Sequence, residues 1–349
     1  MSLLRNTSRY VQYKPLRYQW AYEAYEVIQS MHWLAKEIDI SADVVDYHKL
    51  PEPERVFVRN ILRLFTTNDA QAIQGYATML RIFKPTEIQM MLFAEGNTEA
   101  IHVDAYSLLT DSLGFSDDFY NEYIDIPVME RKIDYLDKAK VKKLEEYIEA
   151  GFTEAQADFK YRQDVARMLA VYAAGLEGIE LMSQFALLLA YQQLGKFRGM
   201  SQINTYSIKD EFQHCVNNSK LFLTYVRENP DIYTDELKED IRRAISQIVE
   251  QESAMTDYLY NTGSHPLVTR DEAKTFTELM ADKALALLGL ETIYNHTKNP
   301  LPFMDDILGN LELSNFFEVE STAYAKGAVE GSWSALRAKP STIRKVKPV

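Results

Sequence analysis

A duplicated Glu-x-x-His spacing is the feature of this sequence with the clearest chemical meaning. It occurs as Glu99-Ala-Ile-His102 and again as Glu211-Phe-Gln-His214. Residues three apart lie on one face of an α-helix, so the carboxylate and the imidazole of each copy can reach the same ion. Carboxylate oxygens combined with imidazole nitrogens suit iron or manganese. Two such helices, facing each other in a bundle, supply four of the ligands that a pair of metal ions needs.

The competing interpretation places these histidines at the surface beside incidental glutamates. The chain has only 6 histidines in 349 residues. One Glu-x-x-His match in such a chain is weak evidence for a metal site, and two matches are moderate evidence. The spacing alone therefore leaves both interpretations open.

Two further carboxylates are needed to complete a site of this kind. Glu177 lies in the apolar stretch Ala-Gly-Leu-Glu-Gly-Ile-Glu, where a charge is unfavourable unless it is paired or binds a metal. The alternative for this segment is a solvated stripe on an amphipathic helix, an interpretation that suits Glu180. Asp69 lies between apolar positions of a long predicted helix, with Asn68 and Gln71 as neighbouring polar alternatives.

Tyr106 lies on the same predicted helix face as the first Glu-x-x-His pair, because it follows His102 by four residues and Glu99 by seven. A phenol beside a redox-active metal pair can lose an electron and a proton. The chain has 22 tyrosines, however, and a tyrosine taken alone is more often a core aromatic.

The composition indicates a protein with a packed core and little affinity for polyanions. The chain is 46% hydrophobic and 26% charged, with a net charge of −13 and a pI near 5.1. Such acidity disfavours binding to nucleic acid or anionic membranes. The single cysteine, Cys215, excludes an internal disulfide framework and a Cys-rich metal site.

The sequence predicts a cytoplasmic protein that has no nucleic acid partner and no membrane segment. Residues 1–15 contain no apolar signal-peptide core. The longest apolar run, about 185–191, is too short to span a bilayer and indicates a buried helix segment.

The spacing of apolar residues predicts an all-α fold. Gly and Pro are scarce, at 13 and 11, and fall mostly between long periodic segments. Pro51-Glu-Pro-Glu54 is typical of a helix start. The expected helices cover 17–36, 52–82, 86–113, 129–149, 154–192, 201–226, 234–261, 270–293 and 302–315. Helices of this length favour a bundle.

The end of the chain differs in composition from the rest. From Lys326 it becomes rich in Gly and Ser and then basic. We therefore expect a helical domain over 1–325 and a flexible tail over 326–349 that docks a partner.

Several segments, taken in order, resemble the small subunit of class I ribonucleotide reductases. They begin with Ser-Met-His-Trp33-Leu-Ala-Lys-Glu, Leu50-Pro-Glu-Pro-Glu54 and Phe-Thr-Thr-Asn-Asp69. They continue with Glu99-Ala-Ile-His102-Val-Asp-Ala-Tyr106, Leu-Glu177-Gly-Ile and Lys-Asp210-Glu211-Phe-Gln-His214, and they end with Asn-Phe-Phe-Glu-Val-Glu-Ser-Thr-Ala-Tyr324. Each segment is ordinary alone, but the ordered set covers the chain from about residue 17 to 325 and is highly specific.

This resemblance implies a ferritin-like bundle, with additional helices around a four-helix core that holds two metal ions. The implied metal ligands are Asp69, Glu99, His102, Glu177, Glu211 and His214. Iron is the metal expected first. Mixed manganese–iron and dimanganese centres remain alternatives, because they use nearly the same ligands.

The resemblance also implies that Tyr106 holds a stable radical, formed with dioxygen at the metal site. Electrons and protons are expected to pass from the metals through His102 and Asp210 to Trp33, with Asp210 accepting the outer N–H of the imidazole. By their spacing from Glu177, Leu181 and Phe185 are expected in the apolar wall that protects the radical.

The implied function is that of the radical-generating subunit of ribonucleoside-diphosphate reductase. The radical passes to a larger catalytic subunit, which reduces ribonucleotides to deoxyribonucleotides. Family members are usually homodimers, and an activating flavoprotein is a further candidate partner. The alternatives are an oxidase or oxygenase of the same fold that acts on a small organic substrate, and a metal-free helical scaffold.

The C-terminal segment departs from the family pattern, in which a tyrosine in the tail relays the radical. No tyrosine follows Tyr324 here, and Trp333 is the only later aromatic residue. Either one of these two residues is the relay, or the transfer step differs.

Overall fold

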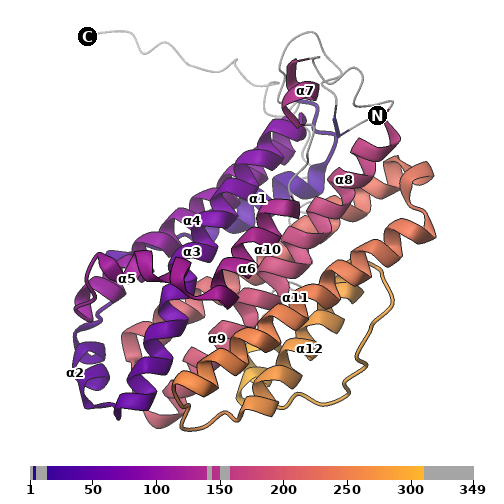
Figure 1. Ribbon diagram of the computed structural model, residues 1–349. Helices are drawn as coiled ribbons and strands as arrows, with labels where there is room; N and C mark the ends of the chain where they lie inside the picture. The colour runs from indigo at the N-terminus through magenta and orange to yellow at the C-terminus, as the bar shows by residue number, and fades with distance from the viewer. Residues whose placement is uncertain (1–2, 5–13, 140–143, 150–157, 310–349) are drawn as a thin grey trace, which may run out of the picture. The chain divides into compact units, whose positions relative to one another are not determined.

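The computed structural model describes residues 3–4, 14–139, 144–149 and 158–309 (Figure 1). The chain forms two compact units, 1–306 and 307–349, and the second is described only over 307–309. The predicted domain boundary after residue 325, the predicted tail and both relay candidates, Tyr324 and Trp333, lie outside the described residues.

Helices make up the regular structure of the described residues, which contain no strand, so the predicted all-α class is confirmed. In chain order the elements are α1 (Gln19–Ser30), η1 (Ala35–Glu37), α2 (Ser41–Lys49), α3 (Glu52–Ile82), α4 (Thr86–Ser112), α5 (Asp118–Asn121), η2 (Glu122–Asp125), α6 (Pro127–Ala139), α7 (Leu144–Glu149), α8 (Phe159–Ala170), η3 (Val171–Leu181), α9 (Met182–Leu189), η4 (Ala190–Leu194), α10 (Arg198–Glu228), η5 (Pro230–Ile232), α11 (Asp235–Thr262) and α12 (Arg270–Leu287).

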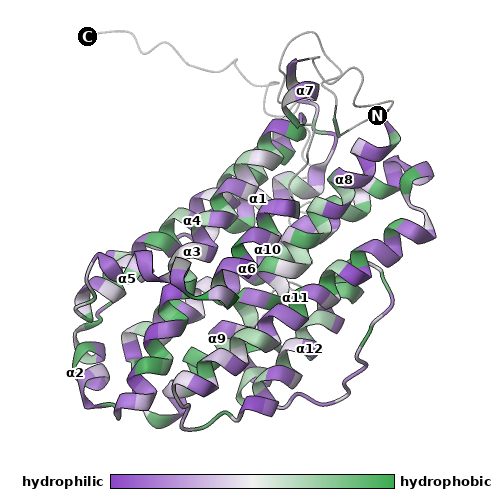
Figure 2. Cartoon of the chain, in the orientation of Figure 1, coloured by the Kyte–Doolittle hydropathy of each residue, from purple (hydrophilic) through white to green (hydrophobic). Residues whose placement is uncertain are grey.

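Four helical segments surround the centre of the first unit. Helix α3 packs along α4, and α10 packs against both α4 and η3 (Figure 1). Helices α11 and α12 also pack against η3. Hydrophobic and hydrophilic residues lie on different sides of helices such as α11, which gives it an apolar side for these contacts (Figure 2).

The helix over Phe159–Leu194 is long and apolar enough to cross a membrane by length and composition, but its most apolar window is 94% buried. It consists of α8, η3, α9 and η4 in direct succession. Such burial is typical of the core helix of a soluble protein, as expected for the apolar run at 185–191.

Local signals account for the starts of helices α3 and α12. Helix α3 follows Pro51 and carries Pro53, Glu52 and Glu54 in its first turn, where proline and acids are favourable. The prediction of a helix over 52–82 is confirmed. Helix α12 begins at a capping box, in which the Thr269 hydroxyl accepts from the Glu272 backbone N–H and the Glu272 carboxylate accepts from the Thr269 backbone N–H.

The structure corrects three predicted helices. The helix expected over 17–36 ends at Ser30, which leaves residues 31–34 non-helical before η1. The helix expected over 270–293 ends at Leu287, because the chain turns at Gly289, which has a φ of +68°. The segment expected over 129–149 forms two helices, α6 and α7, with 140–143 outside the described residues.

Helix α2, which we did not predict, holds the start of α10 in place. Its Asp43 side chain accepts hydrogen bonds from the backbone N–H groups of Gly199 at 2.9 Å and Met200 at 2.6 Å. A carboxylate is favourable at a helix N-terminus because it satisfies free N–H groups and opposes the helix dipole. There is no room for a side chain at Gly199, since a Cβ there would lie 2.7 Å from the Asp39 carbonyl oxygen.

The segment η3 is a π-helix of 11 residues in the middle of the core helix. Its small residues allow close approach of its neighbours. A Cβ on Gly175 would lie 2.3 Å from Ile248 Cδ1, and a Cβ on Gly75 of α3 would lie 2.2 Å from Tyr172 Cε1. π-Helical turns in α-helices are rare and frequently lie at functional sites, and this one carries Glu177.

A buried ion cluster joins η3 to α6 and α11. Lys132 Nζ lies 3.1 Å from Glu180 Oε2 and also pairs with Glu252, and all three side chains are at most 3% exposed. Burial, opposed by Lys132, raises the pKa of Glu180 to about 7. The interpretation of Glu180 as part of a solvated stripe was therefore wrong, because the side chain is buried and pairs with Lys132 of α6, a helix far away in the sequence.

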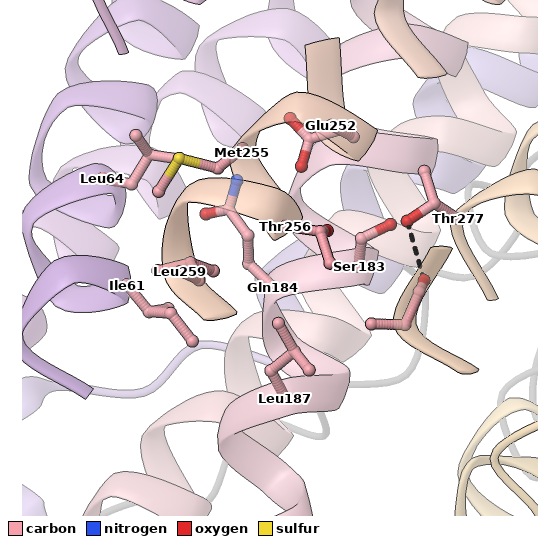
Figure 3. A pocket seen from close by; sticks show the side chains of 11 residues that line it. Ile61, Leu64, Ser183, Gln184, Leu187, Glu252, Met255, Thr256, Leu259 and Thr277 are labelled. Carbon is pink, nitrogen blue, oxygen red and sulfur yellow. Dashed lines mark hydrogen bonds between the residues drawn. The ribbon is translucent and has the colours of Figure 1, made fainter. Parts of the chain in front are cut away.

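A small cavity of about 10 Å³ adjoins this ion cluster, with Glu252 in its wall (Figure 3). Its other polar lining includes Ser183 and Gln184 of α9. The Ser183 hydroxyl and both amide atoms of Gln184 have no hydrogen-bond partner within the described part of the chain. A polar cavity of this volume fits about one water molecule.

We predict that Lys132→Met lowers the free energy of unfolding by about 3–5 kcal/mol near neutral pH, because two buried carboxylates lose their shared cation. Glu180→Gln is the matched variant, since it keeps one ion pair. Its effect depends on pH. The Glu180 pKa lies at about 7 in the folded protein against 4.5 for the ordinary group, so the wild type loses stability as pH rises through this window, and Glu180→Gln escapes that loss.

Urea unfolding at about pH 5 and about pH 8 measures both effects. The stability of Glu180→Gln relative to wild type should increase from the lower to the higher pH. Equal destabilisation of the two variants at the higher pH would contradict this account of the ion cluster.

Candidate metal centre

Six side chains from four helical segments meet in the core, and they are the six that the sequence singled out. They are Asp69 of α3, Glu99 and His102 of α4, Glu177 of η3, and Glu211 and His214 of α10. Each is at most 1% exposed. They fall into two sets of four with ligand atoms within 4.8 Å of one another, and Glu99 and Glu211 belong to both sets.

The two imidazoles turn their Nδ1 atoms toward the carboxylates. His102 Nδ1 lies 3.1 Å from Glu211 Oε1, and His214 Nδ1 lies 2.9 Å from Glu99 Oε1. Glu177 Oε1 is 4.0 Å from His214 Nδ1. The histidines of both Glu-x-x-His copies therefore share one centre, the arrangement on which the metal hypothesis depends.

The outer nitrogens of the imidazoles are held by oxygen atoms. His102 Nε2 lies 3.2 Å from Asp210 Oδ2, and His214 Nε2 lies 2.8 Å from Thr98 Oγ1. The Thr98 hydroxyl donates to the Glu95 carbonyl at 2.7 Å, so it accepts from His214. Both imidazoles thus carry a proton on Nε2, so Nδ1 is the atom that is turned inward and can bind a metal ion.

The inward carboxylate oxygens and histidine Nδ1 atoms form no standard hydrogen bonds with one another, and their chemistry suits metal cations. Neither oxygen of Glu99 or Glu211 has a hydrogen-bond partner within the described residues, and the same holds for Asp69 Oδ2 and for Nδ1 of both histidines. Buried charged atoms without partners are unfavourable. Four carboxylates and two imidazoles match the oxygen and nitrogen donors of iron and manganese sites.

The charges in this cluster are strongly coupled. Burial raises the pKa of Asp69 and of Glu177 well above that of an ordinary carboxyl. Burial also acts to raise the pKa of Glu99, but the nearby imidazoles of His102 and His214 outweigh it and bring the pKa to about 2. Divalent cations would compensate the carboxylates and replace this internal proton balance.

Trp33 lies where the resemblance places it, beside Asp210. Its Nε1–H donates to Asp210 Oδ2 at 2.8 Å, and its ring is stacked near that of His102 with 5.9 Å between centroids. One carboxylate oxygen therefore joins the imidazole of the cluster to the indole. This contact also explains the end of α1, because the non-helical residues 31–34 bring Trp33 into the core.

Tyr106 is fully buried, with the ring of Phe65 stacked on it at 4.6 Å between centroids. Burial raises the pKa of this phenol well above its ordinary value. Phe185, expected in the apolar wall, packs against Phe65, with 5.0 Å between ring centroids. The phenol hydroxyl donates to Asn204 Oδ1 at 2.7 Å, so the surroundings of Tyr106 are not wholly apolar.

Sequence reasoning missed a hydrogen-bonded network around Glu177. The Tyr76 hydroxyl donates to Glu177 Oε1, and Asn218 Nδ2 lies 3.4 Å from Glu177 Oε2. Asn218 Nδ2 also contacts Tyr76 and Glu95, while Asn217 Nδ2 donates to Glu95 Oε1 at 3.0 Å. The helical spacing of Tyr76 from Asp69 and of Glu95 from Glu99 was the available signal.

The two polar neighbours that the sequence offered as alternatives to Asp69 have other surroundings, or no hydrogen-bond partner for the amide nitrogen within the described residues. Gln71 Nε2 donates to the Ile133 carbonyl oxygen at 3.1 Å, which directs its side chain toward α6. Asn68 is buried, and its Nδ2 has no hydrogen-bond partner among the described residues. Asp69 is thus the residue of this segment whose carboxylate meets Glu99, His102 and Glu211.

The fold and this cluster define the class of protein: a ferritin-like helical bundle with a candidate dinuclear metal centre. Residues 10–300 match the family model described as "Ribonucleotide reductase, small chain". The probable ribonucleoside-diphosphate reductase small subunit 048L of Invertebrate iridescent virus 3 is 31% identical over 328 residues, which cover 92% of this chain and 86% of that protein. The chain belongs to the ribonucleotide reductase small chain family.

Solved structures show the same fold. The ribonucleotide reductase R2 subunit of Clostridium botulinum aligns with a TM-score of 0.77 at 20% identity, over 88% of this chain and 94% of that one. The dimanganese(II)-NrdF of Streptococcus sanguinis aligns with a TM-score of 0.71 at 19% identity, over 84% and 96%. Nothing in the comparisons favours the oxidase alternative, and the activating flavoprotein stays a prediction.

Proposed function

We propose that this chain uses Tyr106 and a dinuclear metal centre to generate a radical, and that it passes the radical to a larger catalytic subunit of a class I ribonucleotide reductase. One observation carries the proposal. Asp210 Oδ2 contacts both His102 Nε2 and Trp33 Nε1, so the cluster is joined to an oxidisable indole by two hydrogen bonds. A protein that only stored metal would not need this connection.

Six residues would hold the two metal ions. Asp69 and His102 would bind one ion, and Glu177 and His214 the other, with Glu99 and Glu211 shared, because these two glutamates belong to both sets of ligand atoms. When bound, the metal pair supplies the oxidising power, drawn from dioxygen, that the removal of an electron from a phenol requires. Iron is the metal that we propose first, with manganese in one or both positions as the alternative.

The protein's own residues set the conditions for this chemistry. Tyr106 donates the electron, and the stacked Phe65 ring keeps water from one face of the phenol. Asp210 Oδ2 accepts hydrogen bonds from both His102 Nε2–H and the Trp33 indole N–H. This shared acceptor couples electron movement along the path to the position of the protons. Thr98 plays the corresponding positioning role for His214.

Family membership supports a large catalytic subunit as partner. A homodimer is supported by the similar fold of ribonucleotide reductase Rnr4 of Saccharomyces cerevisiae, which is a homodimer. We propose both for this chain, and sedimentation of the full chain, alone and with the large subunit, tests them. A cytoplasmic location stays a prediction.

We predict that Fe(II) and oxygen produce a tyrosyl radical in the wild type, and that Tyr106→Phe abolishes it while metal binding persists. Electron paramagnetic resonance and light absorption measure the radical, and elemental analysis measures the metal. Tyr225→Phe is the matched control, because Tyr225 is equally buried but packs against Phe83. A radical of unchanged intensity in Tyr106→Phe would refute the assignment. If iron yields none in the wild type, the same test applies with Mn(II).

We predict that Glu211→Ala abolishes stable metal binding, because this carboxylate contributes to both sets of ligand atoms. Elemental analysis after reconstitution should give less than about one metal ion per chain. Glu180→Gln removes an equally buried carboxylate outside the cluster and should retain the wild-type content. A full complement of metal in Glu211→Ala would argue against the shared ligand.

We predict that Trp33→Phe leaves metal binding intact but lowers nucleotide reduction with the large subunit by at least about tenfold, because phenylalanine neither donates to Asp210 nor is readily oxidised. Trp20→Phe is the control, since Trp20 lies on α1 and packs beside Lys220, whose Nζ is 5.2 Å from the centre of the indole ring. Unaltered nucleotide reduction in Trp33→Phe would exclude the indole from the path.

A further inference from the structure

The hydrogen bond between Tyr106 and Asn204 is a feature of the site that the proposed function does not use. The phenol donates to Asn204 Oδ1 at 2.7 Å, and both side chains are fully buried. Asn204 lies on α10 seven residues before Glu211, so it continues the face of that helix which carries the cluster. The phenol therefore meets an amide on the helix that supplies two candidate ligands.

The other end of the Asn204 amide is unsatisfied. Its Nδ2 is buried without a hydrogen-bond partner among the described residues, although it has two N–H groups to donate. A buried donor without a partner is unfavourable and calls for an explanation. Rotation of the amide about its last side-chain bond would exchange Oδ1 for Nδ2 opposite the phenol oxygen.

We propose that Asn204 is a positioning residue that serves Tyr106 in both oxidation states. In the resting state Oδ1 accepts the phenol O–H, and in the radical state the rotated amide donates an Nδ2–H to the phenoxyl oxygen. This inference rests on the proposed function, because it requires a radical on Tyr106. It names the group that the radical oxygen would contact.

The oxidation of Tyr106 makes this exchange necessary. Oxidation of Tyr106 would break the phenol O–H bond, with the electron passing to the oxidised metal pair that the proposed function requires and the proton passing to a basic oxygen at the metal site. The amide cannot keep the proton, because a neutral carbonyl oxygen is a very weak base. The phenoxyl oxygen then has no hydrogen to donate. It and Oδ1 of Asn204 are both hydrogen-bond acceptors, so they repel each other. Rotation replaces this repulsion with an N–H···O hydrogen bond and leaves Asn204 chemically unchanged.

Ser207 is the competing partner for the phenol oxygen. It lies one turn after Asn204 on the same face of α10, is fully buried, and affects the pKa of Tyr106 as a hydrogen-bond donor. Its hydroxyl, however, has no hydrogen bond of standard geometry among the described residues. A test of Asn204 must therefore include Ser207→Ala.

The first experiment examines the radical in the full chain, loaded with Fe(II) and exposed to oxygen in H₂O and in D₂O. Electron–nuclear double resonance and high-field paramagnetic resonance measure hydrogen bonding to the radical oxygen. The wild type and Ser207→Ala should show coupling to one exchangeable hydrogen. Asn204→Leu should lose this coupling and shift the g-tensor of the radical. Retention of the coupling in Asn204→Leu, or its loss in Ser207→Ala, would overturn the proposal.

The second experiment needs neither metal nor radical, so it separates this inference from the proposed function. Infrared spectra of the metal-free protein with ring-labelled tyrosine, taken as the difference from Tyr106→Phe, isolate the Tyr106 C–O stretching band. That band should shift in Asn204→Leu and stay in place in Ser207→Ala. An unshifted band in Asn204→Leu overturns the resting-state contact. If the band shifts in Asn204→Leu but the wild type forms no radical in the first experiment, the resting-state contact is supported and the proposed function is refuted.

Circular dichroism establishes that each variant is folded. Asn204→Ala replaces Asn204→Leu if the larger apolar side chain prevents folding. The same losses of coupling and the same band shift are expected of it.

Discussion

Four carboxylates and two imidazoles share one almost completely buried space, and the rest of the structure depends on how their charge is balanced. Isolated buried carboxylates are strongly unfavourable, so they take up protons, pair with cations or bind metal ions. Without metal, the imidazoles of His102 and His214 supply part of the compensation, as the low pKa of Glu99 indicates. The geometry around the inward Nδ1 atoms suits a cation, because these atoms face carboxylate oxygens without forming standard hydrogen bonds.

Helix α10 organises most of the chemistry. One face carries Glu211 and His214 toward the cluster, and Asn204 toward Tyr106. Asp210 contacts His102 and Trp33, while Asn218 contacts Glu177. Residues of this single helix therefore contact the candidate ligands, the phenol and the indole. The cap that Asp43 provides at the start of α10 contributes to this precision, although it lies far from the cluster in sequence.

The π-helix η3 places two acids in different surroundings. Glu177 joins the candidate metal centre, and Glu180 pairs with Lys132 and lies in a separate ion cluster with Glu252. Both acids are buried, and burial raises the pKa of each. Their different partners, and not their positions in the sequence, separate a candidate ligand from a structural ion. Neighbouring helices also approach η3 closely, because Gly75 and Gly175 leave no room for a side chain.

Helical periodicity in the sequence by itself determined which residues share a face, and this was enough to group Glu99 with His102 and Glu211 with His214. The ordered motifs added Asp69, Glu177, Asp210 and Trp33, and the structure brings all of these side chains together. Only the tertiary structure decided that Lys132 buries Glu180, that Asn204 meets Tyr106, and that the chain leaves the helical path before Trp33. The physical reason is that spacing along one helix specifies neighbours on that helix, whereas contacts between helices depend on how separate faces pack.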